Sequence, residues 1–115
     1  MKIILKGNPY TNNLLYRSHG HIWYMTKKGK DLKEFYRWQA KLQYKENLTR
    51  EPLKIRIGLF FGDKRKRDID NYCKILLDSL TGIVWEDDSQ INEMRIIKDI
   101  VKENPRIEIY ITRIY

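Results

Sequence analysis

The sequence contains a single cysteine, Cys73, among its 115 residues. One thiol excludes an internal disulfide and a cysteine-rich zinc site. No apolar run approaches the ~20 residues that a membrane-spanning helix requires, so no membrane association is expected. The apolar stretch Met1–Leu5 is too short for a signal peptide, and polar residues follow it at once. These absences together predict a cytoplasmic protein.

Proline and glycine are also scarce, at 3 and 6 residues, and they fall between patterned segments, where turns are expected. No internal repeat, low-complexity tract or linker divides the sequence. With 115 residues, 42% of them apolar, the chain can build one small core but not separate cofactor and substrate domains. We therefore expect one domain over residues 1–115.

Basic residues outnumber acidic ones, with 23 Lys and Arg against 15 Asp and Glu, for a formal net charge of +8. A positive surface attracts polyanions, and neutralised phosphates release counterions into solution. The charge therefore favours nucleic acid as the partner.

Hydrophobic periodicity predicts two helices and five strands in the order β-β-α-β-α-β-β. This order indicates an α+β (mixed α/β) fold with one small mixed sheet and two main helices. A polar loop is expected over 7–21. The strands are expected at 1–6, 23–25, 52–61, 91–101 and 106–114, and the helices at 27–47 and 70–80.

The first predicted helix follows a possible Thr26 cap and carries a broad apolar stripe. The stripe consists of Leu32, Phe35, Tyr36 and Leu42. Two amides, Gln39 and Gln43, interrupt it, which is typical of a helix that packs against a wetter surface than a core. We expect ordinary partial burial of this stripe, with a subunit interface as the alternative.

Several single residues admit two interpretations. The tryptophans Trp23, Trp38 and Trp85 are expected in the core rather than at an interface, and Trp85 would buttress the acidic residues that follow it. Cys73 is interpreted as a small core residue rather than a nucleophile. His19 and His21 form a His-x-His pair without an evident third metal ligand, so a solvated or DNA-facing loop is favoured there.

A run of four cations, Lys64, Arg65, Lys66 and Arg67, leads directly into Asp68 and Asp70. If Asp68 is extended and Asp70 begins a helix, the two carboxylates can converge at the helix N-terminus. A second acidic cluster, Glu86–Asp88, follows that helix and can return beside it. Converging carboxylates suit Mg²⁺ or Mn²⁺, and a bound cation would reverse their repulsion of phosphate.

A simpler interpretation of the same residues needs no metal. Asp70 would cap the helix N-terminus and form an i,i+4 pair with Lys74, which contributes a few tenths of a kcal/mol. Asp78 lies one turn further along the same polar edge. From spacing alone, a metal site and a helix cap with an ion pair are equally well supported for Asp70 and Lys74.

The sequence resembles the RusA family of Holliday-junction resolvases (crossover junction endodeoxyribonucleases) over nearly its whole length. The core of the resemblance is the series 65–71, Lys74, 78–80 and 84–90, which reads Asp-x-Asp-Asn, Lys, and Trp-x-Asp-Asp-x-Gln. The opening segment 9–13 with Tyr16 and Arg17, and the closing segment 106–109, are similar to the family's first loop and last strand.

The resemblance implies a homodimeric endonuclease that cuts four-way junction DNA by paired symmetric nicks, using Mg²⁺ or, in its place, Mn²⁺. It places the metal on Asp68, Asp70 and Asp88, with Asp87 the less certain neighbour, and makes Lys74 the essential lysine near the cut phosphate. It leaves the dimer contacts undefined. The residues expected to bind nucleic acid are Asn12, Asn13, Arg17, Lys64, Arg65, Lys66 and Arg67.

Two alternatives remain open from sequence. The chain could be a non-catalytic binder of branched nucleic acid, with the acidic residues serving as caps and salt bridges. It could also be a related nuclease that acts on flaps, forks or RNA. A junction-cutting role in recombination and repair predicts a cytoplasmic, nucleoid-associated protein, and such resolvases often occur in phages and prophages.

Overall fold

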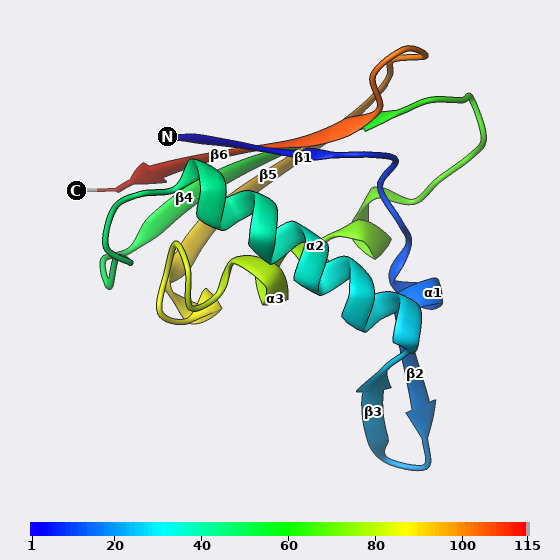
Figure 1. The fold of residues 1–115 in the computed structure, drawn as a ribbon, viewed down its shortest axis with the longest axis horizontal. Helices are drawn as coiled ribbons and strands as arrows, with labels where there is room; N and C mark the ends of the chain where they lie inside the picture. The colour runs from blue at the N-terminus through cyan, green and yellow to red at the C-terminus, as the bar shows by residue number, and fades with distance from the viewer. Residues whose placement is uncertain (115) are drawn as a thin grey trace.

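A four-stranded mixed sheet forms one layer of the computed structural model, which describes residues 1–114 (Figure 1). The order is β1 (Lys2–Lys6), β6 (Arg106–Arg113), β4 (Leu53–Phe61) and β5 (Ile91–Ile100). β6 pairs antiparallel with both β1 and β4, whereas β4 and β5 run parallel. The predicted α+β class with a small mixed sheet and two main helices is confirmed.

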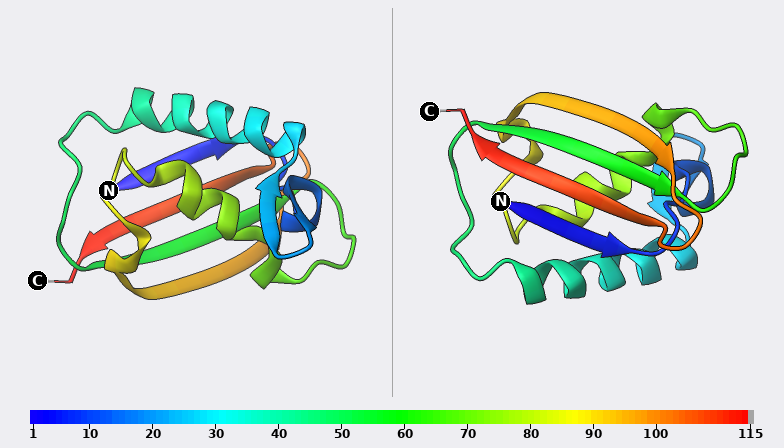
Figure 2. Two further views of the ribbon diagram at one scale, coloured as in Figure 1. Left: turned by 90° about the horizontal axis from the view of Figure 1, so that it is seen from below. Right: turned by 90° about the horizontal axis from the view of Figure 1, so that it is seen from above.

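Two helices, α2 (Lys27–Gln43) and α3 (Lys74–Leu80), cover one face of this sheet (Figure 2). The alternation predicted for β4 explains the layering, because Leu53, Ile55, Ile57 and Leu59 are all buried. The intervening Lys54 and Arg56 are exposed on the opposite face. The core therefore lies between the sheet and the two helices.

The first main helix, α2, begins where the sequence predicts, because the Thr26 hydroxyl accepts a hydrogen bond from the Gly29 backbone N–H at 3.1 Å. It ends at Gln43 rather than at residue 47, since Tyr44 has an extended backbone. Its buried residues include Tyr36, Gln39 and Ala40, so the expected apolar stripe is only partly correct. Phe35 and Leu42, on its outer side, are exposed.

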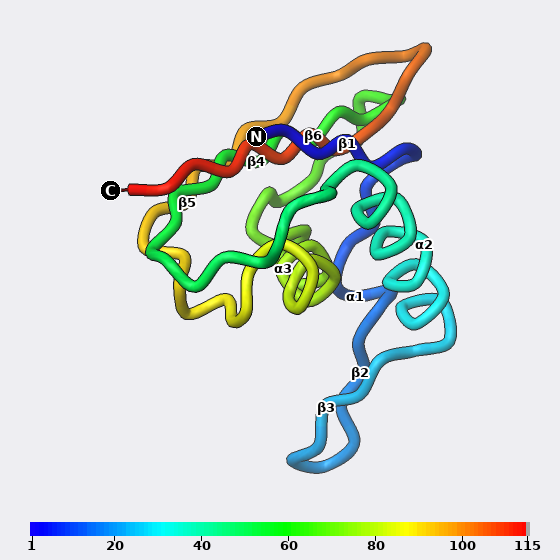
Figure 3. The backbone as a smooth tube through the Cα atoms, turned by 60° about the vertical axis from the view of Figure 1, so that its left-hand side comes forward, coloured from blue at the N-terminus to red at the C-terminus, as the bar shows by residue number. Residues whose placement is uncertain are grey.

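The expected polar loop over 7–21 holds two elements that the sequence did not reveal. They are the short helix α1 (Asn12–Leu15) and the strand β2 (Tyr16–His19). β2 pairs with β3 (Ile22–Met25) in a hairpin that projects from the body (Figure 3). Gly20 turns this hairpin with a φ of 63°, a conformation that favours glycine. The strand predicted near 23–25 therefore forms, but it pairs locally and does not join the main sheet.

The second main helix has two parts, a 3-10 turn η1 (Ile69–Tyr72) and then α3. Its predicted apolar face is buried through Tyr72, Cys73, Leu76 and Leu80. Another short 3-10 turn, η2 (Asp88–Gln90), precedes β5. No helix in the described part of the chain is long and apolar enough to cross a membrane.

The tryptophans separate into two groups. Trp85 is fully buried, and its indole N–H donates to the Thr81 hydroxyl at 2.9 Å, as expected of a core residue beside the acidic cluster. Trp23 and Trp38 are 71% and 59% exposed, so the expectation of core positions is wrong for both. They lie on the projecting hairpin and on the outer side of α2, where no other element covers them.

Candidate active site

Asp68 and Asp70 lie at the junction between the loop after β4 and the helix that follows. Asp68 has an extended backbone (φ −92°, ψ 118°), and Asp70 lies in the first turn of η1. This is the extended-to-helical junction that the sequence predicted. The simpler interpretation fails here, because Asp70 makes no ion pair with Lys74 and no side chain caps η1 within residues 1–114.

Three aspartates are distinguished by having no partner. In the described part of the chain, the carboxylates of Asp68, Asp70 and Asp88 make no hydrogen bond or ion pair, and all three residues are exposed. Each of the other five aspartates has a partner. These pairs are Asp31 with Lys27, Asp63 with Arg65 and Arg67, Asp78 with Tyr16 and Lys74, Asp87 with Ser89, and Asp99 with the Ile100 backbone. The predicted metal ligands are thus the aspartates that remain available to bind a ligand.

The expected convergence of three carboxylates does not occur within one chain. Among residues 1–114, no three His, Cys, Asp or Glu side chains lie close enough together to hold a metal ion. Asp68 and Asp70 lie before α3, whereas Asp88 lines a pocket with Asp78 and Thr81 that includes neither of them. The donor chemistry still fits, because Mg²⁺ commonly binds one or two carboxylates and completes its shell with water and phosphate oxygens.

Lys74 is held in place by two residues whose role the sequence did not reveal. The Asp78 carboxylate lies 3.8 Å from the Lys74 ammonium and accepts a hydrogen bond of 2.5 Å from the Tyr16 hydroxyl. The ammonium also lies 5.1 Å from the centre of the Tyr16 ring. Burial and Asp78 both raise the pKa of Tyr16, so its hydroxyl remains a donor at neutral pH. No spacing signal predicts this contact, because Tyr16 and Asp78 are 62 positions apart.

A polar pocket lies beside the C-terminal end of α3. It is lined by Lys33, Arg37, Asp78, Thr81, Asp87 and Asp88. The Arg37 guanidinium donates to the carbonyls of Ser79 (3.0 Å) and Thr81 (2.8 Å), which satisfies groups at the helix terminus. Lys33 and Arg37 were not predicted as site residues, and only the packing of α2 against α3 brings them to Asp88.

The two neighbouring aspartates have different roles in the structure. Asp87 precedes η2 and forms a capping box with Gln90, in which its side chain accepts from the Gln90 N–H. It also accepts from the Ser89 hydroxyl. Asp88 has no such partner within residues 1–114. This difference favours Asp88 over Asp87 as a ligand, and the assignment stays a prediction.

The basic run before Asp68 is partly neutralised. Asp63 accepts from Arg65 at 3.1 Å and from Arg67 at 2.7 Å, and these bonds hold the pKa of its carboxyl well below the usual range. The Arg67 side chain is only 13% exposed and packs 4.1 Å from the Phe61 ring centre. Arg67 therefore orders the loop, whereas Lys64 and Lys66 are exposed and without an ion pair in the described chain.

Three of the residues predicted to bind nucleic acid, Arg65, Lys66 and Arg67, line a pocket together with part of the N-terminal segment, whereas Asn12, Asn13, Arg17 and Lys64 do not line it. Its walls come from residues 8–11 with Leu14, and from Asp63, Arg65, Lys66, Arg67 and Tyr72. Asn13 and Arg17 are exposed nearby, and the Arg17 guanidinium donates to the Asn13 carbonyl. Asn12 is half-buried, and its side-chain oxygen has no partner within residues 1–114.

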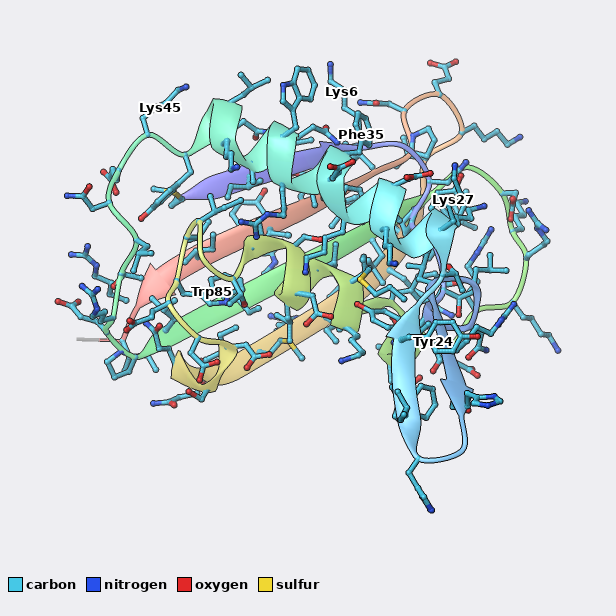
Figure 4. The ribbon with its side chains drawn as sticks, turned by 60° about the horizontal axis from the view of Figure 1, so that its bottom comes forward. Lys6, Tyr24, Lys27, Phe35, Lys45 and Trp85 are labelled. Atoms are coloured by element: carbon cyan, nitrogen blue, oxygen red, sulfur yellow. The ribbon has the colours of Figure 1, made fainter. Side chains whose placement is uncertain are left out.

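The projecting hairpin extends this basic surface. The first 30 residues contain no Asp or Glu. Trp23 and Tyr24 are 71% and 50% exposed on β3. Figure 4 shows Tyr24 on this hairpin. His19 and His21 are exposed at the hairpin tip and belong to no three-ligand group in the described chain. Basic and aromatic side chains together are typical of surfaces that contact nucleic acid.

Comparisons with known proteins identify the family of this chain. The family model "Endodeoxyribonuclease RusA" matches residues 5–112. The chain is 32% identical to the crossover junction endodeoxyribonuclease RusA of Shigella sonnei, over 90% of this chain and 88% of that protein. It is 34% identical to the phage HK97 enzyme of the same name, over 92% and 89%. The chain therefore belongs to the RusA family of endodeoxyribonucleases.

Proposed function

We propose that this chain is a metal-dependent endodeoxyribonuclease that resolves four-way DNA junctions by paired symmetric nicks. Its relatives are named crossover junction endodeoxyribonucleases, and the family membership carries that activity to this chain as a proposal. One structural observation supports it most strongly. The aspartates without a protein partner in the described chain are Asp68, Asp70 and Asp88, and Asp78 and Tyr16 contact the proposed essential lysine, Lys74.

In this proposal, Asp68, Asp70 and Asp88 hold one or two Mg²⁺ ions, and each ion binds one or two of these carboxylates and otherwise water and phosphate oxygens. Mn²⁺ substitutes for Mg²⁺. The bound ion would supply an activated water and stabilise charge on the phosphate. Lys74 is 55% exposed, so its ammonium can reach a phosphate while Asp78 and Tyr16 orient it. Lys64 and Lys66 would attract the DNA backbone. The products would carry a 5′-phosphate and a 3′-hydroxyl, which leaves ligatable nicks.

The proposed working form is a homodimer. One chain holds a single set of these free aspartates, and two symmetric nicks require two sets. A dimer with twofold symmetry provides them at related positions on the junction. The phage HK97 relative also supports a phage or prophage source for this protein.

A labelled four-way junction incubated with the protein and Mg²⁺ tests the proposal. We expect paired symmetric nicks from the unmodified chain and none from Asp70→Asn, which retains junction binding because it removes a negative charge near phosphate. Asp99→Asn is the matched control, because Asp99 is exposed and bonds only the neighbouring Ile100 N–H. Absence of nicks from the unmodified chain, or equal cutting by Asp70→Asn, would contradict the proposal.

A non-catalytic binder of branched nucleic acid is the second candidate, favoured by the absence of a three-ligand cluster within residues 1–114. Crystals of the DNA complex soaked with Mn²⁺ separate the two, because a nuclease site gives anomalous density at Asp68, Asp70 or Asp88. A related nuclease of flaps, forks or RNA is separated by comparing these substrates at matched salt, since salt strongly affects binding.

A further inference from the structure

The outer side of α2 carries residues at the spacing of a coiled-coil seam. Asp31, Phe35, Trp38 and Leu42 are separated by four, three and four positions within the helix, and Lys45 follows two residues after the helix ends at Gln43. We call these five residues the α2 seam. Its three apolar members are 44%, 59% and 53% exposed, in sequence order. The other side of the helix, with Tyr36 and Ala40, packs against the protein itself.

The apolar centre of the α2 seam is already ordered. The Phe35 and Trp38 rings stack with centroids 6.5 Å apart and an interplanar angle of 17°. α2 lies along the β1 edge of the sheet, so its outer side faces away from α3 (Figure 2). A partner on the α2 seam would therefore leave the pocket of Asp87 and Asp88 open. Exposed aromatic and leucine side chains gathered on one helix side mark an interaction surface.

The charges at the ends of the α2 seam identify the partner. Asp31 lies two turns before Trp38 within α2, and Lys45 lies on the other side of Trp38, just beyond the end of the helix. If a second copy packs antiparallel with Trp38 at the twofold axis, Asp31 of one copy meets Lys45 of the other. A parallel pair would instead place like charges together. Figure 4 shows Lys45 just beyond the last turn of α2, on the same outer side as Phe35.

Residues beside the α2 seam show the same charge complementarity. Glu34 lies four positions before Trp38 and Lys41 three positions after it, so the antiparallel pair also brings Glu34 near Lys41 of the second copy. Neither residue makes an ion pair within residues 1–114. A twofold interface must be complementary to itself, and the α2 seam meets that condition.

We infer that the α2 seam is the surface through which two copies of this chain associate, antiparallel about Trp38. The inference rests on the homodimer of the proposed function and specifies its interface. The core consists of Trp38 against its own copy, with Phe35 of each chain against Leu42 of the other. Aromatic residues at the centre of an interface commonly contribute most of the binding energy.

Sedimentation equilibrium across a range of concentrations measures the effect. The unmodified chain is expected to be dimeric, and Trp38→Glu is expected to raise the dimer dissociation constant ~30-fold or more. Leu42→Glu provides a second variant at the seam. Met94→Glu is the matched control, because Met94 is also exposed but lies on β5. Circular dichroism confirms that each variant is folded.

Two further variants test the antiparallel geometry. Asp31→Lys should weaken the dimer, and adding Lys45→Asp should restore it, because the pair then attracts again with reversed signs. Trp38→Cys should form an intermolecular disulfide on oxidation, since the two copies meet at the axis. Lys102→Cys, in the exposed β5–β6 connection, should not. The native Cys73 is buried and does not compete.

The experiments distinguish an error in the interface from an error in the proposed function. If Trp38→Glu and Leu42→Glu remain dimeric and Trp38→Cys forms no cross-link, the α2 interface is wrong. The proposed homodimer would then use another surface. A chain that stays monomeric at every concentration, with and without junction DNA, overturns both. A dimer that depends on the α2 seam but never cuts a junction supports the interface and contradicts the proposed nuclease.

Discussion

The side-chain amide of Gln43 bonds both outward-facing backbone groups of Ile4. The Ile4 N–H donates to Gln43 Oε1 at 2.8 Å, and Gln43 Nε2 donates to the Ile4 carbonyl at 2.7 Å. One turn earlier, Gln39 Oε1 accepts from the Lys6 N–H at 2.9 Å. β1 is an edge strand, so these groups have no neighbouring strand to pair with. The two glutamines that interrupt the apolar stripe of α2 therefore close this edge of the sheet.

Replacing Gln43 with alanine should lower the free energy of unfolding by about 1–2 kcal/mol, because two hydrogen bonds to the β1 edge are lost. The urea unfolding midpoint measures this change. Lys30→Ala is the control, because Lys30 is exposed on the same helix and makes no ion pair in the described chain. Equal midpoints for the two variants would show that water replaces the glutamine without cost.

Asp87 and Asp88 should respond differently to the same substitution. Asp88→Ala should abolish nicking and leave stability nearly unchanged, because its carboxylate has no partner within residues 1–114. Asp87→Ala should lower the free energy of unfolding by about 0.5–1 kcal/mol, since Asp87 caps η2, and should retain cutting. Junction cleavage and urea unfolding of both variants test this. The reverse pattern would move the proposed ligand to Asp87.

These two aspartates show where sequence reasoning succeeds. The resemblance to the RusA family pointed to Asp68, Asp70 and Asp88, which have no partner in the described chain, and the alternation of β4 predicted its buried face. Both are local properties, fixed by residue type and period along a few positions. The structure adds the reason for choosing Asp88, because a capping bond engages its neighbour.

Properties that depend on distant segments could not be predicted. Trp38 belongs to an amphipathic helix, but which side is covered depends on where α2 packs over the β1 edge. Gln39 and Gln43 signalled a polar surface, and only the fold shows that it is the backbone of a strand. The hairpin of β2 and β3 was missed because its strands have four residues each, too few for a clear period.

The contact of Tyr16 with Asp78 predicts a loss of activity without loss of binding. Tyr16→Phe keeps the ring beside Lys74 but removes the hydroxyl that orients Asp78. The nicking rate should fall about tenfold, while junction affinity is unchanged because no positive charge is lost. Single-turnover cleavage and gel-shift titration measure the two quantities. An unchanged nicking rate would show that Lys74 needs no orientation by Asp78.

Glu108 makes the stability depend on acid pH. Its carboxylate lies 2.7 Å from the Lys2 ammonium and 2.9 Å from the Arg106 guanidinium, and it accepts from the Tyr110 hydroxyl at 3.1 Å. The hydrogen bond from Lys2 is the main cause that lowers its pKa, and burial opposes it. The stabilisation is therefore full above the ordinary pKa of Glu, about 4.3, and is lost as pH falls through the lower folded value.

Glu108→Gln should accordingly flatten the fall in unfolding free energy between neutral pH and about pH 3. Urea unfolding at a series of pH values measures the slope. Glu103→Gln is the control, because Glu103 is exposed in the β5–β6 connection and makes no ion pair among the described residues. If both variants keep the slope of the unmodified chain, the acid sensitivity arises from another carboxyl group.

The projecting hairpin should add affinity for branched DNA that salt screens only weakly. Trp23 is the most exposed large apolar residue of the described chain, at 71%, and a base stacked on an indole contributes ~1–3 kcal/mol. Trp23→Ala should therefore weaken junction binding while the slope of log affinity against log salt stays the same. Lys66→Ala should instead reduce that slope, because it removes one phosphate contact. Gel-shift titrations at several salt concentrations compare the two. A reduced slope for Trp23→Ala would indicate that the hairpin acts through its basic residues, and unchanged affinity would show that it does not contact the junction.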